Sequence, residues 1–525
     1  MRSCARAIVA ALEAHGVETI FGIPGTHTLA LHEAVAESGI HHVAPRHEEG
    51  GGYAADGYAR AGGRPGVCLV TTGPGTTNLM TAAATAFHDS VPMLILTPGM
   101  PSDVEGRDAG FLHQVKSQSG AMGNVVEWSR RVGSAEEAVA AIDDAFAHFA
   151  SRRPRPVHVE VPLDVLEGSE TERLADPSRA RSERPAPAAA ELDAAAALLA
   201  DAEAPWLLLG GGAIYAPAAA LTLAERLDAP VVTTVKAKGV VAESHPLSAG
   251  ASLRFAPAKR ALAEADLVLA VGTELAESDL WERSLSFRGK LVRVDLEPAQ
   301  LAKNATPGLA VRGDAAVTMA ALAERLPGAG RRGAERAAAV RAELAPLIER
   351  DGAEFALLHR VLGEVLGPDA VVSGDSSQVS YYGTVHQLPC ERPRRFLYPV
   401  GYATLGYSLP AAIGAKLAGA DQAVAIDGDG GFLFTATEIA TAAQLRLCVP
   451  TIVFDNGGYG EIRAEMLARG APPLGVDMDP VDFPALARAL GGAGESVPYA
   501  AGPLGEALAK ALERPGPTVL AIDRR

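Results

Sequence analysis

The chain has 525 residues, of which 48% are hydrophobic and 21% charged, so it is long enough for roughly two to four globular domains with large cores. Its formal net charge of −16 fits a well-solvated surface and argues against non-specific nucleic-acid binding, which needs clustered Lys and Arg. The four cysteines are far apart and form no CxxC pair, which indicates neither a zinc site nor a disulfide framework.

The apolar stretch 7–12 is interrupted by Glu13 and is too short for a signal peptide or a membrane span. No later apolar run is long enough to span a membrane. Widely spaced thiols fit a reducing compartment. We therefore expect a cytoplasmic protein with no membrane and no nucleic-acid partner.

Short β-branched runs that end in Gly or Pro alternate with Ala-rich helical stretches along the whole chain. This pattern is typical of parallel sheets covered by helices. We predict an α/β protein with three doubly wound parallel-sheet domains. The first is expected at 1–167, with strands at 19–23, 66–71, 93–97 and 156–161, and a polar, Pro-containing linker follows at 168–189.

The second domain is predicted at 190–330, and a charged helical joint leads to the third at 351–525. The second has strands expected at 206–209, 230–235, 267–271 and 291–295. The third has strands expected at 371–373, 423–426, 451–454 and 518–522.

Two polar, Gly-containing loops follow strands of the third domain. One carries Asp429, Gly430 and Gly431, and the other carries Asn456 and Gly458. Open α/β sheets place ligands at the carboxyl ends of their strands. A carboxylate and an amide oxygen suit Mg²⁺, and glycine N–H groups can approach a phosphate. The pair of loops therefore predicts a metal ion held against a diphosphate.

Asn456 follows Asp429 by 27 residues, and the segment 428–460 resembles the signature of thiamine-diphosphate enzymes. Further similar segments lie at 21–25, 72–78, 238–241 and 271–274, so the resemblance to the acetolactate synthase and 2-oxo acid decarboxylase group covers nearly the whole chain. It implies thiamine diphosphate and Mg²⁺ as cofactors and pyrimidine-binding, central and diphosphate-binding domains. GYGEIR and GFLHQ look most like the 5-guanidino-2-oxopentanoate decarboxylases.

The resemblance implies three metal ligands, namely Asp429, the side chain of Asn456 and the carbonyl of Gly458. Gly430 and Gly431 are then expected to donate N–H groups to the diphosphate. Asp455 stands where the family usually has Asn, but it is not an expected ligand.

Ser377 and Gln378 follow another strand and resemble a second diphosphate-contacting turn. A simple Ser-rich turn is the alternative.

The segment 45–60 resembles the family's segment that carries the cofactor-activating glutamate, which by position is Glu48 and not Glu49. Leu405 is the implied apolar wedge that bends the cofactor, and the carbonyl of Ala403 accepts from its aminopyrimidine. Outside this family Glu48 would be a solvated helix N-terminal residue and Leu405 ordinary core. The family site lies between the first domain of one subunit and the third domain of its partner. The resemblance therefore implies at least a homodimer, and a tetramer stays open.

Decarboxylation requires a proton donor for the carbon that loses CO₂, and a histidine titrating near neutral pH suits that role. His113 matches the first histidine of the adjacent pair in pyruvate decarboxylase-like enzymes, and Gln114 replaces the second. Thr71 stands where benzoylformate decarboxylase-like enzymes have a catalytic histidine. His27 is a further candidate, and we assign it to the substrate pocket together with Thr26, Thr71, His113 and Gln114.

Glu461 and Glu465 lie one helical turn apart after the metal loop, and we expect them to line the substrate pocket together with Ile462. A carboxylate there would pair with a guanidinium by bidentate hydrogen bonds. The alternative is that both glutamates face solvent at a helix N-terminus. Ile462 replaces the acid that pyruvate decarboxylases use beside the cofactor, which makes pyruvate less attractive as a substrate.

The leading hypothesis is non-oxidative decarboxylation of a 2-oxo acid with a polar or cationic side chain, such as 5-guanidino-2-oxopentanoate, to an aldehyde and CO₂. The rivals are a carboligase of the acetolactate synthase type and a non-catalytic thiamine-fold binding protein. A glycine run at 210–212 is weak evidence for a nucleotide, and FAD is not expected.

Overall fold

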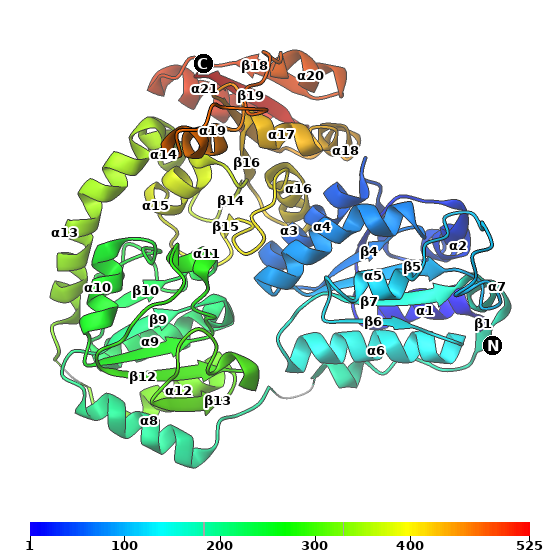
Figure 1. Cartoon of the computed structure of the whole chain (residues 1–525). Helices are drawn as coiled ribbons and strands as arrows, with labels where there is room; N and C mark the ends of the chain where they lie inside the picture. The colour runs from blue at the N-terminus through cyan, green and yellow to red at the C-terminus, as the bar shows by residue number, and fades with distance from the viewer. Residues whose placement is uncertain (182–183, 329, 525) are drawn as a thin grey trace.

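The computed structural model describes residues 1–181, 184–328 and 330–524, which form three parallel sheets covered by helices (Figure 1). This arrangement confirms the predicted α/β class. A short antiparallel ribbon joins β1 (Arg2–Ser3) to β8 (Glu170–Thr171). None of the helices in the described ranges has both the length and the apolar character that crossing a membrane requires.

The first sheet has six strands, and helices α1 to α7 pack around it. In spatial order the strands are β3 (His41–Val43), β2 (Thr19–Phe21), β4 (Gly66–Leu69), β5 (Met93–Gly99), β7 (Val157–Pro162) and β6 (Trp128–Arg131). The helices are α1 (Cys4–Ala14), α2 (Leu29–Ala36), α3 (Glu48–Gly62), α4 (Pro74–Asp89), α5 (Gln118–Met122), α6 (Ala135–Ser151) and α7 (Leu163–Gly168).

The middle sheet has five strands and is joined to the third sheet by the long helix α13 (Gly333–Gly352). Its strands are β10 (Val231–Thr233), β9 (Trp206–Leu209), β11 (Leu267–Val271), β12 (Lys290–Asp295) and β13 (Leu309–Arg312). Its helices are α8 (Ala189–Asp201), α9 (Pro217–Leu227), α10 (Ala256–Glu264), α11 (Glu277–Leu280) and α12 (Ala315–Arg325).

The third sheet repeats the topology of the first, because both run 2-1-3-4-6-5 when their six strands are numbered along the chain. Its strands are β15 (Phe396–Leu397), β14 (Val371–Gly374), β16 (Ala423–Gly428), β17 (Pro450–Asp455), β19 (Thr518–Asp523) and β18 (Ala493–Ser496). Its helices are α14 (Ala356–Val365), α15 (Val385–Gln387), α16 (Ser408–Leu417), α17 (Asp429–Thr435), α18 (Glu438–Gln444), α19 (Gly460–Ala468), α20 (Phe483–Ala489) and α21 (Ala501–Glu513).

The predicted strands are all present, and their ends agree within about two residues. Five further strands, β3, β6, β13, β15 and β18, lie at sheet edges. Edge strands are short or polar, as in Trp128–Arg131 and Ala493–Ser496, because one side of each has no neighbour. A search for long apolar runs therefore misses them.

The segment predicted as a linker is partly fixed to the first sheet. Helix α7 reaches Gly168, β8 pairs with β1, and the backbone N–H of Asp176 donates to Asp143 at 2.9 Å. Residues 182 and 183 of the same segment lie outside the described residues.

Helices α3 and α16 cross closely and join the first and third sheets into one hydrophobic core (Figure 1). A Cβ at Gly57 would lie 2.2 Å from the carbonyl oxygen of Ala411, and one at Gly414 would lie 1.9 Å from that of Ala54. Glycine is required at both positions because any side chain would force the two backbones apart. The crossing sets the position of the Glu48 turn at the start of α3.

Arg60 is a buried cation at the junction of all three sheets. Its Nε donates to Asp56 at 2.6 Å and its Nη2 to Asp89 at 2.7 Å, and both carboxylates are fully buried. Tyr407 from the third sheet donates to Asp56 at 2.6 Å, and Lys236 from the middle sheet lies 3.3 Å from Asp89. Burial alone would raise the pKa of Asp89, but the charges of Lys236 and Arg60 outweigh it and hold that pKa below its usual value.

We expect Arg60→Met to lower the free energy of unfolding by about 3–5 kcal/mol, because it leaves two buried carboxylates without their guanidinium. Chemical denaturation monitored by circular dichroism measures the change. The control is Arg64→Met, whose ion pair with Glu18 is exposed and should contribute less than about 1 kcal/mol. Equal losses in the two variants would contradict this account.

Candidate active site

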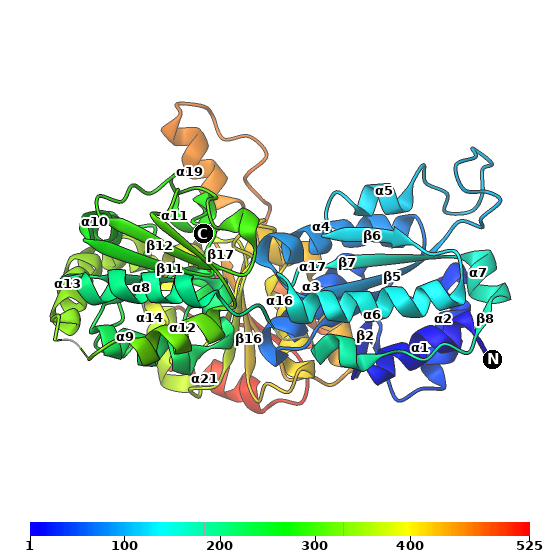
Figure 2. The ribbon, with the colours of Figure 1, turned by 90° about the horizontal axis from the view of Figure 1, so that it is seen from below.

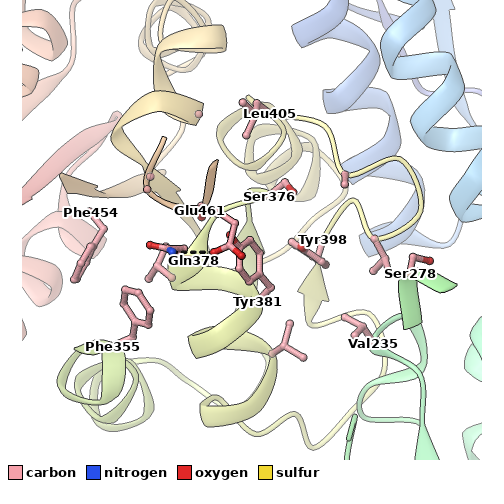
Figure 3. Close-up of a pocket in the computed structure, with 18 of the residues that line it drawn as sticks. Val235, Ser278, Phe355, Ser376, Gln378, Tyr381, Tyr398, Leu405, Phe454 and Glu461 are labelled. Carbon is pink, nitrogen blue, oxygen red and sulfur yellow. Dashed lines mark hydrogen bonds between the residues drawn. The ribbon is translucent and has the colours of Figure 1, made fainter. Parts of the chain in front are cut away.

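Three loops at the carboxyl edge of the third sheet line a cavity of about 590 Å³. Strand β14 leads to residues 376–378, β16 to 428–431 and β17 to 456–458. Because these strands are parallel, their carboxyl ends meet at one edge. The opposite wall includes Val235 and Ser278 from the middle sheet (Figure 3).

The three predicted metal ligands converge. One terminal atom of the Asn456 side-chain amide lies 3.2 Å from Oδ1 of Asp429 and 2.9 Å from the carbonyl oxygen of Gly458. Oxygen ligands about 2.1 Å from an octahedral Mg²⁺ lie about 3 Å from one another. With the amide oxygen turned inward, these three groups have the spacing expected of ligands on one face of an octahedral Mg²⁺, and without a cation the amide nitrogen can donate to the other two.

The charge at this point also fits a divalent cation. Burial, reinforced by a hydrogen bond and the charge of Asp455, raises the pKa of Asp429 to about 6. Oδ2 of Asp429 is buried and has no hydrogen-bond partner among the described residues. A cation would satisfy that oxygen and favour the ionised carboxylate.

The glycines of this loop allow close packing around the expected diphosphate position. A Cβ at Gly431 would lie 1.9 Å from Oδ2 of Asp375, and one at Gly430 would lie 2.8 Å from the Tyr459 ring. Ser377 lies beside Gly428 and lines the same cavity. Gly430 and Gly431 lie in the first turn of α17, where backbone N–H groups have no partner within the helix.

Leu405 and Ala403 line the cavity from the loop before α16. Leu405 is half-buried and so is not ordinary core. Ala403 has a φ of +52°, a left-handed conformation that favours glycine.

Glu461 points into the cavity from the first turn of α19. Gln378 Nε2 donates to its Oε2 at 2.8 Å, and Tyr382 donates to its Oε1 at 2.9 Å (Figure 3 shows the Gln378 contact). The inward position contradicts the solvent-facing alternative for Glu461. Glu465 is exposed at the cavity rim and pairs with Arg469, and Ile462 is also an exposed lining residue.

Sequence reasoning did not single out the aromatic wall beside Glu461. Tyr381 and Tyr382 lie in a π-helical turn at 379–384, and both rings contact Trp281 with centroids about 6 Å apart. The guanidinium of Arg254 lies 4.9 Å from the Trp281 ring centroid and pairs with Asp351 at 3.0 Å. Three of these residues belong to other segments of the chain, so no local motif indicated them.

Glu48 lies at a different edge, that of the first sheet. It begins α3, is 9% exposed, and accepts from Asn78 Nδ2 at 3.0 Å, so it is not a solvated helix terminus. The turn before it is fixed to the third sheet, because Glu438 accepts from the backbone N–H groups of Arg46 and His47 at 2.9 and 3.0 Å.

The other predicted pocket residues of the first domain follow strands β2, β4 and β5 of the same sheet. Thr71 is buried with no partner for its hydroxyl among the described residues, and Thr26 is exposed. His27 and His113 both lie against the hydroxyl of Thr72. Gln114 instead forms hydrogen bonds within its own loop. Its side chain accepts from the Phe111 N–H at 3.0 Å and donates to the Arg107 carbonyl.

One chain therefore carries two separate groups of predicted site residues. Among the described residues that line the cavity, none precedes Thr233, so Glu48, His27 and His113 all lie outside it.

The glycine run at 210–212 has a packing role. A Cβ at Gly212 would lie 2.9 Å from the Cα of Gly272. The run borders a second cavity of only about 150 Å³. That the middle domain holds no FAD stays a prediction.

Three thiamine pyrophosphate enzyme family models match the chain. The N-terminal TPP binding domain matches residues 2–121, the central domain matches 192–322, and the C-terminal TPP binding domain matches 376–522. Together these matches span most of the chain and include both groups of predicted site residues.

Relatives agree with this assignment. A probable 2-ketoarginine decarboxylase of Pseudomonas aeruginosa is 44% identical over 494 residues, which are 93% of this chain and 88% of the relative. A probable acetolactate synthase large subunit of Methanocaldococcus jannaschii is 32% identical, over 87% of this chain and 81% of the relative. The acetolactate synthase isozyme 1 large subunit of Escherichia coli is also 32% identical, over 87% and 82%.

We expect Asp429→Asn to weaken Mg²⁺ binding at least about tenfold, because a charged oxygen ligand is replaced by a neutral amide. Calorimetric titration with Mg²⁺ in the presence of saturating pyrophosphate measures the affinity. Asp369→Asn is the control, since Asp369 is exposed and pairs with Arg392. Unchanged affinity in the Asp429 variant would contradict the assignment.

Proposed function

The chain belongs to the thiamine pyrophosphate enzyme family, and we propose that it decarboxylates a 2-oxo acid with a cationic side chain, most specifically 5-guanidino-2-oxopentanoate. The reaction is non-oxidative and gives CO₂ and an aldehyde. Its cofactors are thiamine diphosphate and Mg²⁺. Support comes from the acidic cavity and from the 44% identity to a probable 2-ketoarginine decarboxylase.

Bound thiamine diphosphate supplies the electron sink for cleavage of the bond to the carboxylate. Asp429, Asn456 and Gly458 hold its metal ion, and Gly430, Gly431 and Ser377 hold the diphosphate. Leu405 and the Ala403 carbonyl orient the ring system. Glu48 holds a proton for the pyrimidine nitrogen.

The uncompensated charge of Glu461 carries the substrate assignment. Its carboxylate is held in the cavity by two neutral donors, Gln378 and Tyr382. Within the described residues no Lys, Arg or His lies within ion-pairing distance of it. A carboxylate oxygen can accept two hydrogen bonds, so both oxygens retain capacity for a bidentate guanidinium.

The aromatic wall favours the same ligand. A guanidinium is planar and weakly hydrated and stacks on aromatic rings. Arg254 already makes such contacts with Trp281 and Tyr382, at 4.9 and 5.4 Å from the ring centroids. A substrate tail that bonds Glu461 lies beside the Tyr381 and Tyr382 rings.

A homodimer completes the site by joining the cavity of one chain to the Glu48 half-site of the other. Helix α19 and the loops around α5 project from the same side of the molecule (Figure 2). Exposed apolar side chains accompany both projections, namely Phe111 and Leu112 on one and Leu467 and Leu474 on the other. A second copy on this side would bury them and bring the two half-sites together. The dimer is the smallest active unit, and two dimers can pair into a tetramer without changing the site.

Product analysis with single substrates tests the function. We expect 5-guanidino-2-oxopentanoate to give CO₂ and the aldehyde, with much slower turnover of pyruvate. The acetolactate synthase relatives favour a carboligase as the second candidate, and acetolactate as the main product would replace our proposal with it. Failure of the protein to bind thiamine diphosphate with Mg²⁺ would favour a non-catalytic role.

Glu461→Gln sharpens this test. We expect kcat/KM for the guanidino substrate to fall about 10- to 100-fold, because one charge-assisted hydrogen-bond pair is lost, while the value for neutral 2-oxohexanoate changes little. Glu465→Gln is the matched control, because that carboxylate is exposed and already paired with Arg469. Parallel losses on both substrates would show that Glu461 does not recognise the tail.

Mixing two inactive variants tests the shared site. Glu48→Gln and Asp429→Asn should each abolish turnover. Glu49→Gln should retain it, because within the described part of the chain Glu49 hydrogen-bonds to Tyr53 of its own helix and to the N-cap residue His47. Subunit exchange between the two inactive variants should restore about a quarter of wild-type activity, since half of the dimers gain one intact site of two. If each site lay within one chain, mixing would restore nothing.

A further inference from the structure

Two histidines of the first sheet share one threonine hydroxyl. The Nδ1 atom of His27 lies 2.5 Å from Oγ1 of Thr72, and the Nδ1 atom of His113 lies 3.5 Å from the same oxygen. The two imidazole ring centroids are 5.1 Å apart. The three residues follow β2, β4 and β5, which are adjacent strands, so their meeting is a property of the sheet edge.

The loop that carries His113 is held in an unusual conformation. His113 has a φ of +63°, in the left-handed region that costs energy for a residue with a Cβ. Its carbonyl approaches Gly73 so closely that a Cβ there would lie 2.3 Å from the oxygen. Gly73 is in turn fixed by its N–H, which donates to Gln118 at 2.9 Å. Such strain persists only where the surroundings hold it, and it is common at functional sites.

The two rings differ in environment. His27 is buried, whereas His113 is half-buried. Burial lowers the pKa of His27, the charge of His113 lowers it further, and Glu167 opposes the shift. The lowered pKa of His27 therefore favours the neutral form of that ring.

We propose that Thr72 and His27 are positioning residues that orient His113 as the proton donor to the substrate carbon that loses CO₂. The inference rests on the proposed function. The Thr72 hydroxyl donates to Nδ1 of His27 and accepts from Nδ1–H of protonated His113. This arrangement leaves Nε2–H of His113 outside the Thr72 contact, where it can donate, and replaces the adjacent second histidine, whose position holds Gln114.

The proton transfer balances. The electron pair left on carbon when CO₂ departs forms the new C–H bond. The Nε2–H bond of His113 breaks, and its electron pair stays on Nε2. His113 is then neutral, keeps Nδ1–H on Thr72, and regains its proton from water. Apo distances such as 3.5 Å commonly shorten when substrate binds.

The first test needs no cofactor and no activity. Modification of His113 by diethyl pyrocarbonate, followed across pH by peptide mass spectrometry, reports its apparent pKa. We expect Thr72→Val to lower that pKa by about one unit, because the imidazolium loses its acceptor, a tenfold change in the protonation ratio. Thr72→Ser, which keeps the hydroxyl, should match the wild type. His27→Phe should lower the pKa of His113 as Thr72→Val does. Without Nδ1 of His27 as its acceptor, the Thr72 hydroxyl proton is no longer directed away from His113.

Ser129→Ala is the matched control. It removes a hydroxyl-imidazole hydrogen bond of 2.7 Å to His158, which is fully buried in the same sheet, and should leave the His113 titration unchanged. An unchanged titration in Thr72→Val, or a failure of Thr72→Ser to restore it, would overturn the inference whatever the reaction is.

The second test uses the loaded enzyme. In a single turnover, Thr72→Val should release CO₂ at nearly the wild-type rate but release aldehyde at least tenfold more slowly, with KM little changed. Slowing of both steps together would mean that Thr72 acts before proton delivery and would overturn the role. If no 2-oxo acid is decarboxylated at all, the proposed function fails, while the titration still decides whether Thr72 and His27 position His113.

Discussion

The close crossing of α3 and α16 is the constraint on which both halves of the site depend. Glu48 begins α3, and the loop with Ala403 and Leu405 runs directly into α16. The two helices can approach only because Gly57 and Gly414 have no side chain. Glu438 adds two hydrogen bonds to the turn before Glu48, so the acid is fixed relative to the third sheet of its own chain. A rigid pair of sheets is thereby formed, with two open carboxyl edges.

The repeated 2-1-3-4-6-5 topology explains why there are two such edges. In each sheet the loop after its third strand is rich in glycine, Thr72–Gly75 after β4 and Gly428–Gly431 after β16. The third-sheet loop carries the carboxylate for a metal, whereas the first-sheet loop carries hydroxyl groups beside Glu48. One cofactor has a charged diphosphate and a basic ring system, so the two edges are chemically suited to its opposite ends. The proposed dimer lets each edge act on the same molecule.

Charge is distributed unevenly around the cavity. Asp429 and Asp455 lie at the metal position, and Glu461 lies between Gln378 and Tyr382 with no cationic partner among the described residues. Arg254 also lines the cavity, but it is paired with Asp351. Asp429 and Asp455 are buried and Glu461 is half-buried, and a carboxylate withdrawn from water is costly unless a cation neutralises it. A metal ion would neutralise the charge of Asp429 and Asp455, and a cationic substrate tail would neutralise Glu461.

The sequence by itself determined the central strands, the fold class and the family. Short β-branched runs that end in Gly or Pro favour buried strands. The spacing from Asp429 to Asn456 is specific because two neighbouring parallel strands deliver both residues to one edge. The position within segment 45–60 also indicated Glu48, and not Glu49, as the candidate cofactor-activating glutamate. Only the tertiary structure decided the polar edge strands, the partners of Glu461, and the meeting of His27, Thr72 and His113. These features join residues from distant segments or from strands with too little apolar surface to leave a periodic pattern, and such contacts arise only when the sheets assemble.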